Sequence, residues 1–562
     1  MTDQEQQLEC IAGDTPYWMH VNDIQVDGRS FDLVGRKYQQ DIMRSTTPEG
    51  KFKHNEVIRK GSQIGVTICK VAEVTHGALH GLYPQGIIIY FPSKTAVELF
   101  SASRFKPFIE DNPEAIGKFM GKVDRADVRI IGKTNVYFFG GTATIRIGGS
   151  EKDSTAVRST PADWILLDER DAFDEEMTKQ VNQRLGNSQI WRRTDMGTPK
   201  IPEYGIDLLY KKSNQGRWQI QCESCKKHTC VESEFPSCIK FSDNGYYFKC
   251  SHCGGRIDTN EGGWEFDEPK RDIVGYWVSQ LLNPNTNLDR FLKQYANPED
   301  YDTTPGEFQR VSMGLPYIDT EDELQESDVF ACCGRDGMAI GSKMGCAMGV
   351  DVGNPLYAVI GYPKDRGRYQ VIKLARVPDW GALHDLAKKF NIKSEVIDAQ
   401  PEFHRVREYQ KAEKHAVYLC YYNETQRQFV VWLPDNIVKV NRTEIFDATH
   451  CMVKDPGVLT LPRRDIEEVK VFAHQMTRSV RALETDKRTG SKIYRYRRRG
   501  DKEDHYRNAM NYFLMACKKI GIPREIRADH PRPLTQDMSY QVGVQRDARR
   551  ELSRIQDMSY SH

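Results

Sequence analysis

The stretch Trp164-Ile-Leu-Leu-Asp-Glu169 decides the fold class of the amino-terminal half, because it is an apolar strand that ends in two acids. An ATPase needs such a pair beside the terminal phosphate of its nucleotide. The first acid, Asp168, would support Mg²⁺, and the second, Glu169, would polarise the attacking water. A strand can also end in Asp-Glu for structural reasons alone, so the interpretation requires a phosphate-binding loop upstream.

The candidate loop is Lys60-Gly-Ser-Gln-Ile-Gly-Val-Thr67. Gly61 and Gly65 allow backbone N–H groups to approach phosphate, and Thr67 can reach Mg²⁺. Val66 stands where such loops usually carry a lysine, so Lys60 would supply the positive charge; an ordinary glycine-containing turn is the alternative. We expect the nucleotide to contact Lys60, Gly61, Ser62, Gln63, Ile64, Gly65, Val66 and Thr67.

Short apolar runs alternate with amphipathic stretches on both sides of this loop. Runs such as 86–91, 128–131 and 136–139 are bounded by Gly, Pro or charged residues, as is typical of buried strands in a mostly parallel sheet. A second pattern of this kind begins at Met348 and ends in an expected helix over 504–519. The sequence therefore predicts two α/β domains.

Four of the 14 cysteines form two CxxC pairs, Cys222/Cys225 and Cys250/Cys253. Each pair can form a tight turn that points two thiolates at one cation, and two such turns complete a tetrahedral S₄ site for structural Zn²⁺. Disulfides are the alternative. We interpret the neighbouring His228, Cys230, Cys238 and His252 as non-ligands.

Three acids of the second α/β pattern predict a nuclease. Asp351 and Asp398 end apolar strands, and Asp504 precedes the last helix. Two strand acids and one helix-start acid match an RNase H-like site that holds two Mg²⁺ or Mn²⁺ ions. Glu402, His404 and His505 are possible helpers. The basic stretch 487–499 just before Asp504 would bind DNA phosphate, with a solvated loop as the alternative.

The amino-acid composition excludes several classes of protein. The 562 residues carry 80 Lys plus Arg against 79 Asp plus Glu, so DNA binding must come from local patches. Apolar residues make up 39% of the chain, which excludes wholesale disorder. We find neither an apolar run of about 18 residues nor a signal peptide, and expect a cytoplasmic protein.

The combined motifs resemble the large terminase subunit of tailed bacteriophages, in particular the lambda-type gpA-like family. That family carries its loop cation early, as Lys60 stands here, and has an Asp-Glu pair like Asp168-Glu169. The resemblance implies an adenine-side motif at Tyr38-Gln39 and a coupling motif at Gly197-Thr198-Pro199. It also implies an arginine finger at Arg158, which could equally be a surface residue. Asn508 stands where the family often has an acid.

The resemblance implies a P-loop (ASCE-type) ATPase domain with a zinc-ribbon insertion, followed by an RNase H-like nuclease domain. We expect an amino-terminal arm at residues 1–30, the ATPase core at 31–205 and the zinc ribbon at 206–256. A linker or lid would follow at 257–340, the nuclease at 341–520 and a tail at 521–562.

The function that this resemblance implies is ATP-driven packaging of double-stranded DNA into a procapsid, with metal-dependent cleavage of the concatemer. The expected partners are DNA, the portal protein, the small terminase subunit and further copies in a ring, in the host cytoplasm. Two alternatives stay open: a helicase-nuclease of repair or restriction type, and a zinc-ribbon DNA-binding scaffold with a degenerate ATP site.

Overall fold

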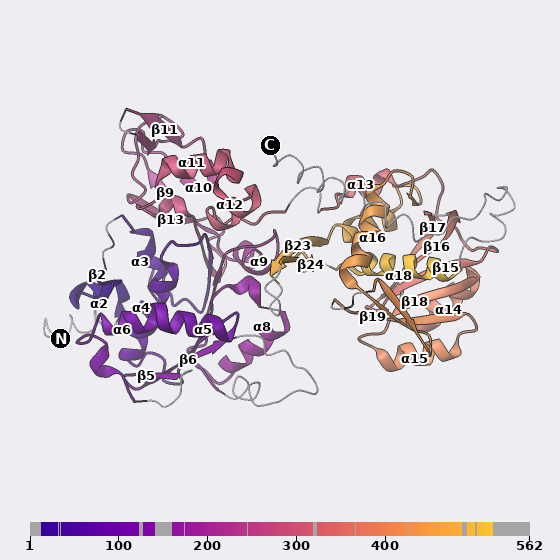
Figure 1. Cartoon of the computed structure of the whole chain (residues 1–562), viewed down its shortest axis with the longest axis horizontal. Helices are drawn as coiled ribbons and strands as arrows, with labels where there is room; N and C mark the ends of the chain where they lie inside the picture. The colour runs from indigo at the N-terminus through magenta and orange to yellow at the C-terminus, as the bar shows by residue number, and fades with distance from the viewer. Residues whose placement is uncertain are drawn as a thin grey trace, which may run out of the picture. The chain divides into compact units, whose positions relative to one another are not determined.

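The computed structural model describes residues 13–31, 33, 35–122, 128–140, 160–173, 175–243, 245–318, 323–365, 367–424, 426, 428–485, 492–500 and 503–520. Within these ranges no helix is long and apolar enough to cross a membrane. The chain divides into two compact units (Figure 1), unit 1 within residues 1–323 and 478–503 and unit 2 within 324–477 and 504–562.

Unit 1 is built on a ten-stranded sheet whose central strands are parallel. Five of them lie in the order β14-β3-β8-β7-β4, so β8 separates the strand that carries Lys60 from the strand that ends before Asp168. This order confirms the predicted P-loop, ASCE-type fold. The strands are β3 (Asn55–Lys60), β4 (Ile87–Phe91), β5 (Val128–Ile131), β6 (Thr134–Gly140), β7 (Trp164–Leu167), β8 (Arg192–Gly197), β9 (Gly216–Gln221), β10 (His228–Thr229), β13 (Gly262–Phe266) and β14 (Val274–Val278).

Continuous apolar sequence explains why the central strands are buried on both faces. All five residues of β4 and all five of β14 are buried, as expected for parallel strands covered by helices on each side. The helices of unit 1 are α2 (Thr15–Val21), α3 (Tyr38–Ile42), α4 (Val66–Leu79), α5 (Lys94–Phe100), α6 (Lys106–Glu110), α8 (Glu175–Asn182), α9 (Gly205–Lys212), α10 (Val231–Glu234), α11 (Leu288–Ala296) and α12 (Pro305–Val311).

Shorter elements complete unit 1. A π-helix, η1 (Ser101–Phe105), joins α5 to α6, and 3₁₀ turns stand at η2 (Gly117–Phe119), η3 (Arg170–Ala172), η4 (Gln183–Leu185), η5 (Gln280–Leu282) and η6 (Pro298–Tyr301). Three separate two-stranded hairpins are β1–β2 (Gln25–Val26, Arg29–Ser30), β11–β12 (Ile239–Ser242, Gly245–Phe248) and β23–β24 (Ser479–Thr485, Lys492–Arg498).

Two segments of unit 1 differ from the expected organisation. Part of the expected amino-terminal arm forms α2, which buries Trp18 and Met19 in the main core. Part of the expected linker forms β13 and β14, and β14 pairs in parallel with β3. The cysteine module is therefore an insertion into the sheet, and the strand beside the phosphate-binding strand follows it in the sequence.

Unit 2 has an eight-stranded mixed sheet, with the core order β17-β16-β15-β18-β19. The first three strands pair antiparallel, whereas β15, β18 and β19 pair in parallel, which confirms the predicted RNase H-like fold. The strands are β15 (Cys346–Asp351), β16 (Leu356–Asp365), β17 (Arg368–Val377), β18 (Ile392–Asp398), β19 (Ala416–Tyr422), β20 (Val430–Leu433), β21 (Ile437–Val440) and β22 (Leu459–Thr460).

The helices of unit 2 cover both faces of its sheet. They are α13 (Glu326–Ala331), α14 (Trp380–Lys389), α15 (Phe403–Ala412), α16 (Arg442–Lys454), α17 (Glu467–Met476) and α18 (His505–Ile520). Met348 and Val350 of β15 share a core with α14 and α15. Gly349 instead meets α18, where a Cβ would overlap the carbonyl oxygen of Ala509. Because side chains alternate along a strand, Asp351 belongs to the α18 face.

Candidate functional site

The loop after β3 has the shape of an anion site. Gly65 stands before α4 with φ of 79°, and a Cβ there would lie 2.9 Å from Nε2 of Gln39. Glycine is therefore required both for the backbone angle and for space. The 14-residue helix α4 directs its first N–H groups into this loop. The N–H of Gly61 donates to the Val278 carbonyl and that of Ser62 to the Val311 carbonyl, so an anion in this loop would meet the amides that follow them.

Lys60 lies at the end of β3 beside both predicted acids. Its Nζ is 3.8 Å from Oδ1 of Asp168 and 3.4 Å from Oε1 of Glu169. Burial lowers the pKa of Lys60, but the two carboxylates raise it, and the net shift is upward. Thr67 Oγ1 donates to Oδ2 of Asp168 across 3.4 Å. A hydroxyl and a carboxylate oxygen are ligands that Mg²⁺ prefers, so this pair fits the expected ion.

Glu169 has an unusual backbone, with φ of 58° and ψ of 53°. Its amide donates to the side chain of Asp168 over 3.0 Å. At Gly197 a Cβ would lie 2.9 Å from the amide nitrogen of Arg170 and 3.3 Å from the Cα of Glu169. The end of β8 therefore packs directly against the strained acid, and a non-glycine side chain there would displace it.

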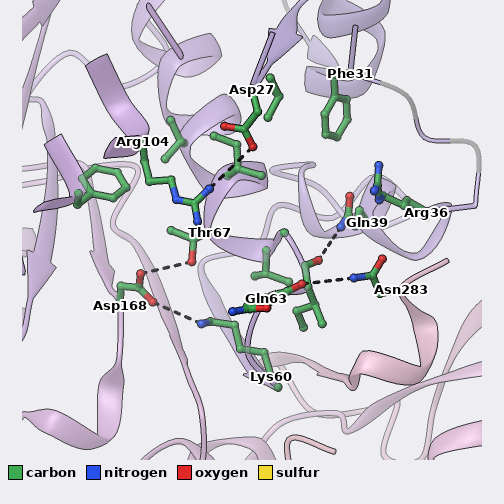
Figure 2. Close-up of a pocket in the computed structure, with 18 of the residues that line it drawn as sticks. Asp27, Phe31, Arg36, Gln39, Lys60, Gln63, Thr67, Arg104, Asp168 and Asn283 are labelled. Carbon is green, nitrogen blue, oxygen red and sulfur yellow. Dashed lines mark hydrogen bonds and ion pairs between the residues drawn. The ribbon is translucent and has the colours of Figure 1, made fainter. Parts of the chain in front are cut away.

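A cavity of about 1090 Å³ opens over the loop and contains most of the predicted nucleotide contacts (Figure 2). Gln39 is buried in its wall: its Nε2 donates to the Ile64 carbonyl over 2.8 Å, whereas its Oε1 has no hydrogen-bond partner in the described ranges. An unsatisfied buried acceptor is costly, and the exocyclic amine of adenine would satisfy it. The predicted residues that line the cavity are Gln39, Lys60, Gly61, Gln63, Ile64, Gly65, Val66, Thr67, Asp168 and Glu169.

Three other predicted contacts stand outside the cavity lining. Tyr38 supports the loop, since its hydroxyl donates to the Ile64 carbonyl over 3.3 Å. Ser62 faces Val311, its hydroxyl 3.5 Å from that carbonyl, and Thr198 follows β8 outside the cavity lining. Arg158, the expected arginine finger, lies outside the described residues.

Sequence reasoning missed several residues of this cavity. Figure 2 shows Phe31, Arg36, Arg104 and Asn283 around it. Asn283 donates from Nδ2 to the Gln63 carbonyl, 3.3 Å away. These residues come from segments far apart in the chain, and no local spacing marks them.

The four predicted cysteines converge on one point. Their sulfur atoms all lie within 4.8 Å of one another, and those of Cys222 and Cys253, and of Cys225 and Cys250, are 3.6 Å apart. Tetrahedral Zn²⁺ with Zn–S bonds of about 2.3 Å places its sulfurs about 3.8 Å apart, so the donor set fits zinc. Both pairs form equivalent turns, with amides donating back to the carbonyls of Cys222 and Cys250.

Neighbouring histidines and cysteines bond away from this cluster. His228 Nδ1 lies 2.5 Å from Glu265, and His252 Nε2 lies 3.2 Å from the His228 carbonyl. The thiol of Cys230 donates to Glu232, and that of Cys238 to the Val231 carbonyl. The hydrogen bonds agree with the interpretation of all four residues as non-ligands.

Two of the three predicted acids of unit 2 stand at one edge of its sheet, and Asp504 directly precedes α18, which packs on β15. Val350 pairs with Ile397 in parallel, so Asp351 and Asp398 end adjacent strands. Burial raises the pKa of Asp351 to about 6, with a further upward contribution from Asp504. Burial and the charge of Asp351 raise the pKa of Asp398 to about 7. Carboxylates are the ligands that divalent cations prefer. Among the described residues, however, only the four cysteines bring three or more such donor atoms close enough together to hold an ion as they stand.

His505 is the helper residue that this structure favours. Its Nδ1 lies 2.6 Å from Oδ2 of Asp351, and its ring stacks on Tyr357 with centroids 4.5 Å apart. Glu402 and His404 are exposed, and Glu402 pairs instead with Arg405 at 3.7 Å. Asn508 accepts a hydrogen bond from the hydroxyl of Tyr422, which ties it to the fold.

The basic stretch 487–499 falls in the β23–β24 hairpin, and its tip, 486–491, lies outside the described residues. The hairpin groups with unit 1: Val480 and Ala482 pack with Ile201, and Arg478 pairs with Glu203 at 3.1 Å. Its described part thus packs just after the predicted coupling motif, although the sequence had suggested a place beside Asp504.

Comparison with known proteins agrees with the amino-terminal half of this interpretation. Residues 36–269 match the family model described as "Phage terminase large subunit gpA, ATPase domain". A search of curated proteins gives no match. The predicted resemblance to the phage large terminase is confirmed for this stretch.

Solved structures give weaker likenesses. The HK97 bacteriophage large terminase is 10% identical, with a TM-score of 0.48 over 88% of this chain and 98% of that one. The large terminase of a thermophilic bacteriophage is 13% identical, with a TM-score of 0.33 over 85% and 98%. The large terminase nuclease of the thermophilic phage G20c is 10% identical, with a TM-score of 0.22 over 35% and 98%. The resemblance to the gpA ATPase domain rests on the family-model match over residues 36–269 and not on these values.

Proposed function

We propose, from the membership of residues 36–269 in the gpA ATPase-domain family of phage terminase large subunits, that this chain is a DNA-packaging motor. It would couple ATP hydrolysis to movement of double-stranded DNA into a procapsid and cut concatemeric DNA with its second unit. The observation that carries the proposal is the meeting of Lys60, Thr67, Asp168 and Glu169 at one end of a nucleotide-sized cavity.

In the ATPase unit, each residue has a defined task. Gln39 would read adenine, and Lys60 with the amides at the start of α4 would hold the phosphates. Thr67 and Asp168 would hold Mg²⁺, which when bound neutralises charge on the phosphates. Glu169 would orient the attacking water and accept its proton. The contact between Gly197 and Glu169 gives the coupling motif a direct path to this acid.

In the other unit, Asp351, Asp398 and Asp504 would hold two Mg²⁺ or Mn²⁺ ions, and those ions when bound activate water and stabilise the leaving oxygen. Cys222, Cys225, Cys250 and Cys253 would hold structural Zn²⁺ in a closed site without catalysis. The predicted domain boundaries and the arginine finger at Arg158 remain proposals. DNA, a portal protein, a small subunit and further copies of this chain would be the partners, in the host cytoplasm.

A helicase-nuclease and a scaffold with a degenerate ATP site would make different use of the same fold. No specific observation favours either alternative. The scaffold was suggested by the missing lysine at position 66, but Lys60 lies beside both acids in its place. The packaging motor is therefore the function we put to the test.

The test is ATP hydrolysis by the full chain. We expect Lys60→Ala to lower the turnover number by at least about a hundredfold, since it removes the cation from the phosphates. Glu169→Gln should bind ATP and fail to cut it, with a loss of about a hundredfold or more. The exposed Lys94 provides a matched control, and Lys94→Ala should hydrolyse ATP normally. Unchanged turnover in Lys60→Ala with normal folding would show that the phosphate site lies elsewhere.

A further inference from the structure

The cations around the nucleotide cavity come from outside the phosphate-binding loop. Apart from Lys60, the positively charged residues that line its described part are Arg29, Arg36 and Arg104. Lys60 already faces Asp168 and Glu169. A bound ATP is negatively charged even with Mg²⁺, so its terminal phosphate needs a further positive partner. Figure 2 shows Arg36 near Gln39, whereas Arg104 points into the cavity between Asp27 and Thr67.

The packing of the neighbouring phenylalanines in the core directs the Arg104 side chain into the cavity. The residue lies in the π-helix η1, and the flanking Phe100 and Phe105 both pack on Phe138, with centroids 5.8 and 4.9 Å apart. In a uniform α-helix, residues five apart are separated by about 140° around the axis. The wider π turn lets both rings enter the core and turns Arg104 towards the cavity. Such turns occur often at functional sites.

Asp27 also lines this cavity and pairs with Arg104. It stands in the β1–β2 turn with φ of 52°, and its Oδ2 is 3.9 Å from Nη1 of Arg104. The hairpin is attached to the end of α6: the amide of Gln25 donates to Asn112 over 2.7 Å, and that of Gly28 to Asp111 over 3.0 Å. Because α6 continues η1, Asp27 and Arg104 are held in register with each other.

The ion pair between Asp27 and Arg104 is easily exchanged. Both side chains are more than half exposed, at 72% and 59%, and an ion pair in water contributes little. A phosphate oxygen beside Thr67 offers the guanidinium a stronger, charge-assisted bond. The arrangement thus provides a place for Arg104 both without and with nucleotide.

We propose that Arg104 binds the terminal phosphate of ATP from within the same chain and leaves Asp27 when the triphosphate occupies the cavity. This inference rests on the proposed ATPase function and adds to it a residue that distinguishes ATP from ADP. The diphosphate would not reach Arg104, which then keeps its pairing with Asp27.

The experiment compares binding of a non-hydrolysable ATP analogue and of ADP, each with Mg²⁺, to the full chain by calorimetry. Arg104→Ala should weaken the analogue by about 10- to 100-fold, the range of a charged hydrogen bond, and change ADP binding by less than about threefold. Arg104→Lys should recover part of the loss. Lys106→Ala removes a charge two positions on, where the side chain pairs with Glu110 outside the cavity lining. It should bind both nucleotides normally.

Asp27→Asn supplies the reciprocal test. It should strengthen binding of the analogue about threefold, because the competing carboxylate is removed, and should do nothing in the Arg104→Ala background. Equal weakening of both nucleotides by Arg104→Ala, or no weakening in a normally melting variant, would overturn the inference while leaving the ATPase proposal intact. A wild-type chain that binds neither nucleotide would contradict the proposed function and this inference together.

Discussion

Lys60 shows at the residue scale how a loop without the usual lysine keeps a cation at the phosphates. The residue ends a buried strand, so its side chain runs along the carboxyl edge of the sheet towards Asp168. Val66 is 1% exposed and packs in the main core with Ile64. Val66 also lines the nucleotide cavity, but it brings no charge there. Lys60 is therefore the residue of this loop that brings a cation to the two acids.

Other residues of the cavity had no signal in the sequence. Phe31, Arg104 and Asn283 line the cavity only because the chain folds, whereas Gln39 was expected from the resemblance to the terminase family. In unit 2, Glu395 is a further residue whose place in the structure could not be read from the sequence. It lies three positions from Asp398, yet it accepts a hydrogen bond from Tyr409 over 3.1 Å on the opposite face. Alternation along β18 separates the two acids, which composition alone could not reveal.

A pH prediction concerns Glu232 of α10, which burial brings to a pKa of about 7 from 4.5. The folded state holds this proton more tightly than the unfolded state, so stability falls as the pH rises from about 4.5 to 7. Glu232→Gln does not titrate. Its stability relative to the wild type should therefore rise by about 2 kcal/mol between pH 5 and pH 8.

Thermal melts of both proteins at the two pH values measure this difference. Glu234→Gln on the same helix is the control, since Glu234 is only partly buried, and it should track the wild type. A constant offset between Glu232→Gln and the wild type would show that Glu232 is ionised in both states.

At the element scale, strand ends position most of the chemistry. The apolar runs before Asp168, Asp351 and Asp398 were sufficient to predict β7, β15 and β18, and the structure confirms all three strands. The spacing of these motifs along the chain could not predict the order of the strands in the sheets. The placement of β8 between β3 and β7, and of β14 beside β3, depends on packing of distant segments.

The cysteine turns yield a prediction about metal content. The four thiolates should bind one Zn²⁺ per chain, with folding free energy on the order of 10 kcal/mol. Elemental analysis should therefore find about one zinc per chain, and a strong chelator should lower the melting temperature. Cys225→Ser should reproduce the chelator's effect, whereas Cys451→Ser, at an exposed cysteine of unit 2, should keep both zinc and stability. Zinc-free protein with an unchanged melt would refute the site.

At the scale of the whole molecule, the chain combines two α/β units, and each contains one of the two predicted sets of acids. The nucleotide cavity is lined by residues between Val26 and Asn285, all in unit 1, whereas Asp351, Asp398 and Asp504 belong to unit 2. The two units are not simply consecutive in the sequence. The β23–β24 hairpin follows α17 of unit 2 along the chain but packs in unit 1. Sequence order alone could not assign it.

The distribution of acids predicts two separable activities. Asp351→Asn removes one carboxylate from the expected metal site, and losing such a ligand costs several kcal/mol of transition-state stabilisation, at least about a hundredfold in rate. Plasmid nicking with Mn²⁺ should therefore disappear while phosphate release from ATP continues. Glu169→Gln should do the reverse. Asp385, exposed on α14, provides the control, and Asp385→Asn should retain both activities. Nicking that survives Asp351→Asn would remove this residue from the cleavage site. Loss of both activities in a chain that still melts normally would show instead that ATP hydrolysis depends on the second unit, so that the two sets of acids form one mechanism.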